Sequence, residues 1–303
     1  MTGKELEQYL LQSLNMALGS MMQGETSYTN SFTCKVTEEG FYFLPRLPAG
    51  YIVDDDLYQK IFLIASAALY PKFTLLKQNS AYFVPMDTDD IHTQRALFFP
   101  WQQGISERLV ISDLDRFTSS LTNQQIPIMK QLTLNYQNIT SIAIAGNSGS
   151  GKSYMLTYLL SVLKPISELI IVDPKFDTPS RWARIHDITV IHPHQNRSKS
   201  DFLSEINENL SHCLQVIQQR QTILYDDPDY QFDHLTIVID EVLALAEGVN
   251  KTIKDAFFSL LSQIALLGRA TKVHLLLVSQ RFDHQTIPVS VREQLNVLIQ
   301  IGN

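Results

Sequence analysis

The chain has 303 residues, of which 45% are hydrophobic and 18% are charged, and its formal net charge is −7. This composition is typical of a globular protein with room for two domains, and it excludes a mainly disordered chain. The acidic balance argues against a protein whose whole surface coats nucleic acid, although a locally basic pore or groove is compatible with it.

The cysteines and the apolar runs indicate the compartment. Cys34 and Cys213 lie far apart without a paired spacing, so a reducing compartment is the simplest interpretation. The longest apolar run, residues 61–70, is too short to span a bilayer, and no signal-peptide pattern is present. We expect a cytoplasmic protein without a transmembrane segment, recruited to a membrane only through partners.

Residues 1–24 are predicted to form an amphipathic helix. One apolar stripe recurs at helical spacing and consists of Leu6, Leu10, Leu14, Leu18 and Met21. We expect this stripe to pack on a partner surface or on the next domain.

Residues 25–124 are predicted to hold a small α+β domain and a linker. Alternation over 32–36, a turn at 38–40 and the aromatic run 41–44 indicate a hairpin. The other expected elements are a buried helix over 57–70 and short strands over 81–84, 96–99 and 109–111, with Pro85 and Pro100 as strand ends. The polar stretch 112–125 is interpreted as the linker.

The acidic run Asp54-Asp55-Asp56 has two interpretations. Three neighbouring carboxylates are candidate metal ligands, but carboxylates also favour the first turn of a helix. The second interpretation is favoured because a helix is expected to begin here.

Residues 125–303 are predicted to form an α/β motor domain. The expected strands are 141–145, 168–173, 188–192, 235–239 and 273–278, and the expected helices between them are 152–163, 203–225 and 253–267. Strands that are continuous apolar runs separated by helices indicate a mainly parallel sheet covered by helices on both faces.

A glycine-rich segment links the first strand and the first helix of this domain. The apolar run 142–145 leads into Gly-Asn-Ser-Gly-Ser-Gly-Lys-Ser and then into an amphipathic helix, which is the P-loop pattern in its proper context. Inward N–H groups at a helix start bind phosphate, and glycines permit positive φ and close approach of the main chain. The candidate nucleotide-binding residues are Gly146, Asn147, Ser148, Gly149, Ser150, Gly151, Lys152, Ser153 and Tyr154.

Two residues of this loop are expected to act on the triphosphate. Lys152 would reach the β- and γ-phosphates, and the Ser153 hydroxyl would ligate Mg²⁺. The alternative, a glycine-rich turn that binds nothing, is disfavoured because a strand precedes the loop and a helix follows it.

The strand 235–239 ends in Asp240 and Glu241. At the carboxyl edge of a parallel sheet these carboxylates would lie beside the ligand crevice. We expect Asp240 to hold Mg²⁺ and Glu241 to orient and deprotonate the attacking water. The alternative is an acidic pair that only begins a helix, and the P-loop upstream favours the catalytic interpretation.

Two further polar residues are catalytic candidates. Gln280 follows a strand predicted to lie beside the P-loop strand, so its amide would sense the γ-phosphate or the attacking water. Arg269 lies near a helix end, where it is either a complement to the helix dipole or an arginine finger for a neighbouring subunit's nucleotide.

Other polar groups give weaker signals. His192 and His194 have the spacing of a metal-binding pair, but no third ligand is evident and a surface loop is favoured. Basic residues that could face DNA in a central pore are Arg197, Lys199, Lys251 and Lys254. For each one, solvated surface charge is the alternative.

Four segments in this order resemble the FtsK/SpoIIIE family of DNA-translocating ATPases, within the FtsK–HerA group. They are Ala145 to Ser153, Val172-Asp173-Pro174-Lys175, Ile239-Asp240-Glu241, and Gly268-Arg269-Ala270 leading to Ser279-Gln280-Arg281. The resemblance covers about residues 125–303. Lys272 stands where the family usually has glycine, and Phe282 stands where proline commonly follows the Gln-Arg pair.

The resemblance implies a RecA-like motor that uses ATP and Mg²⁺. It also implies a hexameric ring that threads double-stranded DNA, in conjugative transfer or DNA segregation, with a relaxase or membrane-anchored machinery as further partners. Another core strand is expected just before Ile301-Gly302-Asn303, and the family's final strands beyond it are missing from this sequence, so the motor domain is expected to be incomplete at that end.

Two alternative functions stay open from the sequence. One is a protein-secretion or coupling ATPase that acts on polypeptides with the same motor. The other is a nucleotide-dependent assembly module with little turnover.

Overall fold

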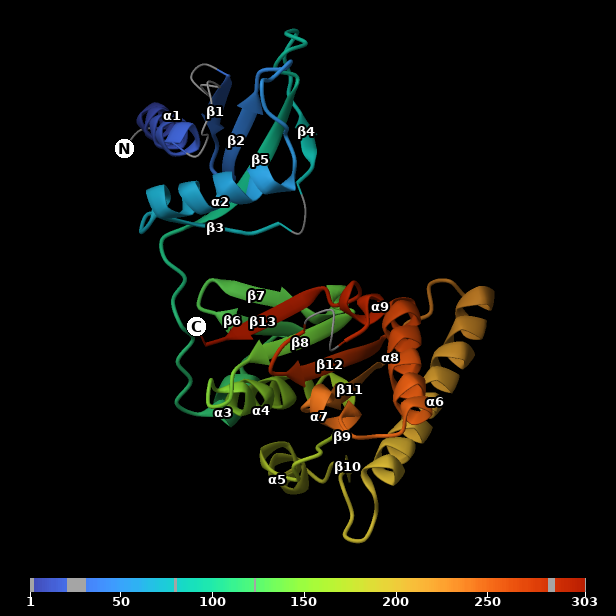
Figure 1. The fold of residues 1–303 in the computed structure, drawn as a ribbon. Helices are drawn as coiled ribbons and strands as arrows, with labels where there is room; N and C mark the ends of the chain where they lie inside the picture. Colours follow the sequence, from blue (N-terminus) through green and yellow to red (C-terminus); the bar gives the residue numbers. More distant parts are fainter. Residues whose placement is uncertain (1–2, 21–30, 79–80, 123, 283–286, 303) are drawn as a thin grey trace. The chain divides into compact units, whose positions relative to one another are not determined.

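A computed structural model describes residues 3–20, 31–78, 81–122, 124–282 and 287–302. The chain forms two compact units. Unit 1 comprises residues 1–108 and 129–131, and unit 2 comprises residues 109–128 and 132–303 (Figure 1).

Unit 1 is an antiparallel sheet packed on two helices. Its strands are β1 (Phe32–Val36), β2 (Gly40–Pro45), β3 (Phe73–Leu75), β4 (Phe83–Pro85) and β5 (Arg95–Gln103), and its helices are α1 (Gly3–Ser20) and α2 (Asp55–Leu69). The strand order is β1-β2-β5-β3, and β4 also pairs with β5. The predicted hairpin is the antiparallel pair β1 and β2, with Cys34 opposite Phe43.

The predicted stripe of the first helix packs inside unit 1. Leu10, Leu14 and Leu18 are at most 1% exposed and share a core with Phe41, Phe99 and other residues of β2, β5 and α2. Helix α1 therefore joins the small domain, although the sequence assigned it a segment of its own, because its stripe covers that domain's core. Met21 lies outside the described residues.

Three local features of unit 1 bear on the sequence expectations. Asp54 caps α2, since its carboxylate accepts a hydrogen bond from the Leu57 N–H at 3.0 Å, which supports the helix-start interpretation. Strand β5 continues through Pro100, whose carbonyl still accepts from the Leu76 N–H. Residues 109–111 form no strand; only Arg108 bridges to Met129.

Unit 2 is built on a parallel sheet. In the described part of the chain its strands are β8 (Ser141–Gly146), β9 (Ser167–Val172), β10 (Val190–Ile191), β11 (His234–Ile239), β12 (Val273–Ser279) and β13 (Val297–Ile301). Their order is β10-β9-β11-β12-β8-β13, and all neighbours are parallel.

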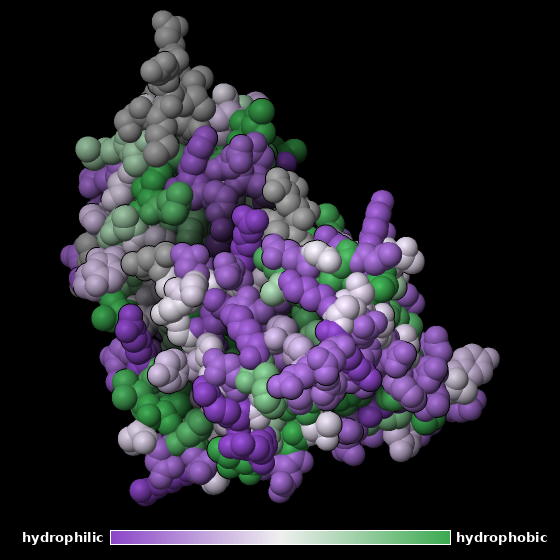
Figure 2. All heavy atoms as spheres, turned by 60° about the horizontal axis from the view of Figure 1, so that its bottom comes forward, coloured by the Kyte–Doolittle hydropathy of each residue, from purple (hydrophilic) through white to green (hydrophobic). Residues whose placement is uncertain are grey.

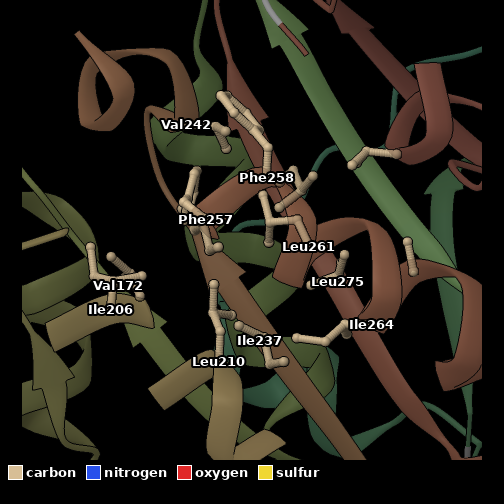
Figure 3. Close-up of a cluster of buried hydrophobic side chains, with 14 of the residues drawn as sticks. Val172, Ile206, Leu210, Ile237, Val242, Phe257, Phe258, Leu261, Ile264 and Leu275 are labelled. Atoms are coloured by element: carbon tan, nitrogen blue, oxygen red, sulfur yellow. The ribbon is translucent and has the colours of Figure 1, made fainter. Parts of the chain in front are cut away.

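Helices cover both faces of this sheet. They are α4 (Lys152–Leu163), α5 (Thr178–Ile185), α6 (Lys199–Asp226), α7 (Val242–Ala246) and α8 (Lys251–Thr271). Alternate residues of β11 and β12 enter opposite cores: Ile237 and Leu275 pack with α6 and α8 (Figure 3), and Val238 and Leu276 pack with α4 and α5. This confirms the predicted α/β fold with helices on both faces.

Several elements of unit 2 have no counterpart in the sequence analysis. They are α3 (Leu114–Ser119), the hairpin β6 (Gln125–Met129) and β7 (Leu132–Asn135), the short 3-10 helix Tyr136–Asn138, α5, α7 and α9 (Val289–Arg292). Phe117 of α3 lies 6.4 Å from Tyr158 of α4, measured between ring centroids, so the stretch interpreted as a linker packs on the motor domain. Unit 2 therefore begins near residue 109, before the sequence boundary at 125.

A buried polar network lies at the amino end of the sheet. His234 and His274 contact each other through ring nitrogens 2.7 Å apart, and the Tyr136 hydroxyl contacts the Thr236 hydroxyl at 2.5 Å. Burial, followed by the neighbouring His234, lowers the pKa of His274 to about 3, so this histidine is neutral and structural.

The surface is mixed in polarity. Figure 2 shows mostly hydrophilic side chains with small hydrophobic clusters between them on the face in view. Among the described helices, none is both long enough and apolar enough to cross a membrane.

Gly268, in the last turn of α8, gives a test of this packing. A Cβ there would lie 2.1 Å from the Val273 carbonyl oxygen, because the chain turns directly from α8 into β12. We expect Gly268→Ala to lower the free energy of unfolding by about 2 kcal/mol or more, measured by denaturant titration. Leu266→Ala, on the exposed side of α8, is the control and should change it by less than about 0.5 kcal/mol.

Candidate functional site

The carboxyl ends of the parallel strands gather the candidate residues. Strand β12 lies between β8 and β11, with Ser279 opposite Ala145 and Leu277 opposite Ile239. The loop after β8, the acidic pair after β11 and Gln280 after β12 therefore lie at one edge of the sheet, which is where parallel α/β sheets bind ligands.

The loop 146–153 has the backbone of a phosphate-binding turn. Gly149 and Gly151 have φ of +78° and +102°, which side-chain-bearing residues rarely adopt, and α4 begins directly at Lys152. Gly146 does not have positive φ, contrary to the sequence expectation. It is required because a Cβ there would lie 2.4 Å from the Ile301 carbonyl oxygen of β13.

Lys152 is folded over the loop. Its ammonium donates to the carbonyls of Gly146 at 2.7 Å and Asn147 at 3.1 Å, and the residue is only 8% exposed. Ser153 and Tyr154 are exposed in the first turn of α4. The Lys152 ammonium therefore lies inside the turn of the loop, where it could contact an anion bound by the loop N–H groups.

Two observations test whether this loop fits a triphosphate with Mg²⁺. The Ser150 hydroxyl is buried and has no hydrogen-bond partner, so the loop keeps an unused polar group. The Asp240 carboxylate at the end of β11 also supplies an oxygen ligand of the type that Mg²⁺ prefers, at the same edge of the sheet. The residues fit the group: the loop and Lys152 would hold the phosphates, and Ser153 and Asp240 would hold the metal.

Asp240 and Glu241 end β11 in a sharp turn. The Asp240 N–H donates to the Val172 carbonyl, and the Asp240 carboxylate accepts from the Glu241 N–H at 3.0 Å. Glu241 has φ of +48° and is 6% exposed. The strained turn aims the Glu241 carboxylate inward from the end of the strand.

Glu241 already has a partner. Lys175, which follows β9, donates its ammonium to a Glu241 carboxylate oxygen at 2.6 Å. This hydrogen bond is the largest cause of the raised pKa of Lys175. In the sequence, the Asp-Pro-Lys segment indicates only the family resemblance. Its position directly after β9, the strand that pairs with β11, is the signal that could have predicted this contact.

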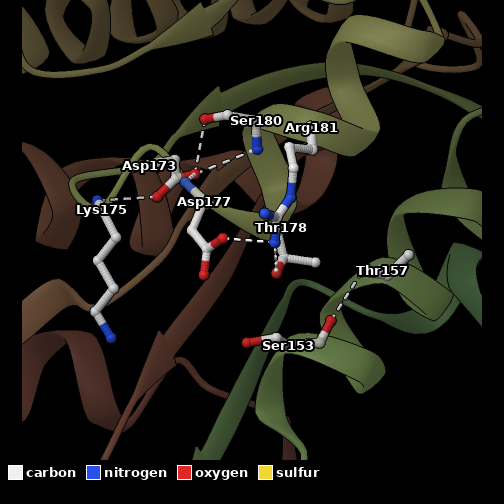
Figure 4. A network of polar contacts seen from close by, with 8 residues as sticks. All are labelled: Ser153, Thr157, Asp173, Lys175, Asp177, Thr178, Ser180 and Arg181. Atoms are coloured by element: carbon white, nitrogen blue, oxygen red, sulfur yellow. Dashed lines mark hydrogen bonds and ion pairs between the residues drawn. The ribbon is translucent and has the colours of Figure 1, made fainter.

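Asp173 holds the loop that carries Lys175. It is fully buried and its carboxylate accepts four hydrogen bonds, from the Lys175, Asp177 and Ser180 N–H groups and from the Ser180 hydroxyl. Figure 4 shows this network, with the Lys175 ammonium pointing away from Asp173. Asp173 therefore fixes the backbone and leaves Lys175 free to reach Glu241.

Asp240 has an altered acidity. Burial, followed by the nearby carboxylates of Glu241 and Asp173, raises its pKa from 3.8 to about 6. Its charged form is therefore disfavoured until a cation compensates it, which is the electrostatic condition of a metal ligand.

The other two catalytic candidates, Gln280 and Arg269, lie at opposite ends of the sheet strands. Gln280 is exposed at the edge that holds the loop. Arg269 is also exposed, but it lies with Gln137 and Lys272 at the amino end of the sheet, so it does not reach this chain's own loop. Lys272, which replaces the family's usual glycine, ends α8 with φ of +56°, the conformation that glycine suits best.

The weaker candidates have local partners. The His192 ring lies 4.0 Å from the Phe176 ring and 4.9 Å from the His194 ring, between centroids. In the described ranges, no group of three or more His, Cys, Asp or Glu side chains is placed to hold a metal ion. Arg197 pairs with Glu205 at 2.9 Å, which leaves its charge partly compensated.

Comparison with known proteins supports this interpretation. No family model matches the chain. The chain is 22% identical over 187 residues to the FtsK domain-containing protein YdcQ of Bacillus subtilis (strain 168), covering 59% of this chain and 38% of that relative. The chain thus spans well under half of that protein. This match confirms the predicted resemblance to the FtsK/SpoIIIE family.

One of the similar solved structures has a TM-score above 0.5 and supports the fold. The pCW3 conjugation coupling protein TcpA, in its monomer form with ATPγS, has a TM-score of 0.53 at 14% identity, covering 98% of this chain and 83% of that chain. EssC (ATPases 2 and 3) from Geobacillus thermodenitrificans has a TM-score of 0.46 at 15% identity, covering 65% and 39%.

The raised pKa of Asp240 predicts that the free energy of unfolding depends on pH. Because its folded pKa of about 6 exceeds its ordinary value of 3.8, the contribution of the carboxyl to stability is fully present below pH 3.8 and is lost as the pH rises through 6. Without metal and nucleotide, Asp240→Asn should raise the free energy of unfolding at pH 8 by up to about 3 kcal/mol and have little effect at pH 4. Denaturant titrations at both pH values test this, and an equal effect at both would contradict it.

The Lys175–Glu241 ion pair predicts that loss of the lysine lowers the free energy of unfolding. The Glu241 side chain is 8% exposed and that of Lys175 is 56% exposed, so the pair is partly screened by solvent. Lys175→Met should lower the free energy of unfolding by about 1–2 kcal/mol, because it leaves a buried carboxylate unpaired. Thermal unfolding measures this, and the double variant Lys175→Met, Glu241→Gln should recover most of the loss. No recovery would show that the two residues act independently.

Proposed function

We propose that this FtsK/SpoIIIE-like chain is an ATP-driven motor that moves double-stranded DNA, in conjugative transfer or DNA segregation. The observation that carries the proposal is the convergence of the glycine-rich loop, Asp240, Glu241 and Gln280 at one sheet edge. Loops of this type bind triphosphates, and hydrolysis needs a positioned carboxylate beside them. The likeness to a conjugation coupling protein solved with ATPγS supports ATP as the nucleotide.

Each residue has a separate task in this proposal. Loop N–H groups and the Lys152 ammonium bind the phosphates, and Ser153 and Asp240 hold Mg²⁺, which would neutralise charge on the β- and γ-phosphates. Glu241 accepts the proton of the attacking water, and the Gln280 amide orients that water. Because Lys175 occupies one Glu241 oxygen, its ammonium must release or share that oxygen for proton transfer to occur there.

DNA would be bound by phosphate contacts without base readout. A net charge of −7 requires the basic groups to be local, as they would be in the pore of a hexameric ring. Within the described part of the chain, Lys199, Lys251 and Lys254 are the candidates that form no ion pair. Arg269 would act on a neighbouring subunit's nucleotide. A relaxase or membrane-anchored machinery would be the further partner.

The rival function is a secretion or coupling ATPase that acts on polypeptides. The same nucleotide site would drive it, so the substrate must be tested directly. Stimulation of hydrolysis by a polypeptide substrate, with none by DNA, would favour it.

Steady-state ATP hydrolysis with and without duplex DNA at low salt tests the proposal. We expect DNA to raise the rate several-fold, and Glu241→Gln to lower kcat by at least about a hundredfold with ATP binding kept, because only proton transfer is lost. Lys152→Ala should abolish binding and turnover together. Tyr225→Ala, on the exposed side of α6, is the matched control and should keep the wild-type rate.

Two outcomes would contradict the proposal. An ATP hydrolysis rate that does not change when DNA is added would contradict the proposal that the chain moves DNA. A wild-type turnover rate in Glu241→Gln would contradict the assignment of Glu241 as the catalytic base.

A further inference from the structure

A small pocket lies beside the edge strand of the parallel sheet, between β10 and α5 (Figure 1). It has a volume of about 300 Å³, at the lower limit for ligand pockets, so it has room for one or two side chains rather than for a large cofactor. All its lining residues belong to unit 2. The apolar lining residues are Phe176, Ile188 and Val190, and the basic ones are Arg181, Arg184 and His192.

Strand β10 has one unpaired edge. In the described part of the chain it pairs only with β9, and it stands at one end of the strand order. An unpaired edge presents main-chain N–H and C=O groups that another strand can bind. Val190 of β10 packs on the core that α4 and α5 cover, and it also lines the pocket. A strand added to β10 would therefore place alternate side chains over the pocket.

Phe176 is held in place by a strained turn. Its φ is +52°, it is 60% exposed, and its ring centroid lies 4.0 Å from that of His192. Asp173 fixes this turn, because its carboxylate accepts hydrogen bonds from the N–H groups of Lys175 and Asp177 on either side of the ring. Backbone strain that surrounding contacts maintain is typical of ligand sites. The aromatic wall is therefore formed before any ligand arrives.

The surface around the pocket is basic, unlike the chain as a whole. Residues 174–199 carry five Lys or Arg against two Asp, whereas the net charge of the chain is −7. Among the described residues, Arg184 forms no ion pair. Arg181 pairs with Asp177 (Figure 4), but both side chains are more than half exposed, so the pair contributes little to stability. Both guanidinium groups can therefore bind carboxylates of a partner.

The other polar groups of the lining are mostly in use. The Ser180 hydroxyl donates to the Asp173 carboxylate at 2.7 Å. The Nδ1 of His192 lies 3.1 Å from the Pro193 carbonyl oxygen, which leaves its Nε2 as a further donor or acceptor. The pocket thus offers a ligand apolar contact and positive charge.

We propose that this surface binds an extended segment of a protein partner, which adds a strand to β10 and inserts an apolar side chain into the pocket. Residues i and i+2 of a strand share a face, so carboxylates two positions before and after the apolar residue would lie on the side of Arg181 and Arg184. The recognised pattern is acidic, any, apolar, any, acidic. This inference goes beyond the proposed function, because it concerns a partner and needs neither hydrolysis nor DNA.

The pocket favours a peptide over nucleic acid as the ligand. Both carry negative charge, but DNA binds through phosphate contacts and has no main-chain amides to pair with a strand edge. An apolar pocket beside an unpaired strand is the arrangement that recognises alternate side chains of an added strand.

Fluorescence anisotropy with the whole chain at low salt tests the charge pattern. The probes are four labelled peptides, Thr-Glu-Thr-X-Thr-Glu-Thr with X as Val, Ile, Leu or Phe, and the same four with lysine in place of glutamate. We expect at least one acidic peptide to bind with micromolar affinity and its lysine version to bind at least about tenfold more weakly.

Variants of the chain locate the binding surface. Arg184→Glu should weaken the acidic peptide by about tenfold and strengthen the lysine version, because the charge of the partner site is reversed. Arg116→Glu, on the exposed side of α3, makes the same charge change elsewhere and should affect neither peptide.

Main-chain pairing is tested with two N-methylated forms of the acidic peptide that binds best. The N–H groups of alternate residues point to opposite edges of a strand, so each form blocks one edge. One form should lose at least about tenfold in affinity, and the other should keep the affinity of the unmethylated peptide.

Four results would overturn the inference. They are no binding of any acidic peptide up to millimolar concentration, equal losses in Arg184→Glu and Arg116→Glu, equal affinities of the two N-methylated forms, and binding of duplex DNA that Arg184→Glu abolishes while no peptide binds. The last result would assign this surface to nucleic acid. Each of them leaves the proposed ATP hydrolysis unaffected, since the nucleotide site is measured separately.

Discussion

The parallel pairing of β12 between β8 and β11 is the constraint on which the rest of the structure depends. It fixes the loop 146–153, the pair Asp240 and Glu241, and Gln280 at one edge of the sheet, although they come from distant parts of the chain. The pairing is itself stabilised by two hydrophobic cores, because alternate residues of the central strands enter opposite faces. Burial on both faces makes a one-residue slip costly, so the geometry of the edge is set by the core.

Concentrated negative charge is the second determinant of this edge. Asp173, Asp240 and Glu241 end two neighbouring strands, and each is stabilised differently. Asp173 is stabilised by four hydrogen bonds and Glu241 by the Lys175 ammonium. The Asp240 carboxylate accepts a hydrogen bond from the Glu241 N–H, and burial with the neighbouring carboxylates raises its pKa to about 6. Asp240 is the carboxylate that the proposed chemistry assigns to the metal.

Sequence reasoning recovered the parts of the fold that repeat a simple pattern. The loop before Lys152, the apolar strands and the stripe of α8 each carry a strong local signal, and α4 has the predicted bounds 152–163. The missing parts depend on tertiary contacts. No local sequence signal shows that Gly146 is required because its backbone lies against Ile301. The Lys175–Glu241 pair was hidden for the same reason, because only strand order reveals which loop ends are neighbours.

A structure of the chain with Mg²⁺ and ATPγS tests the central claim most directly. The account predicts the triphosphate within loop 146–153, the Lys152 ammonium moved from the Gly146 and Asn147 carbonyls to the phosphates, and the metal between Ser153 and Asp240. A nucleotide bound elsewhere, with Lys152 still on those two carbonyls, would contradict it.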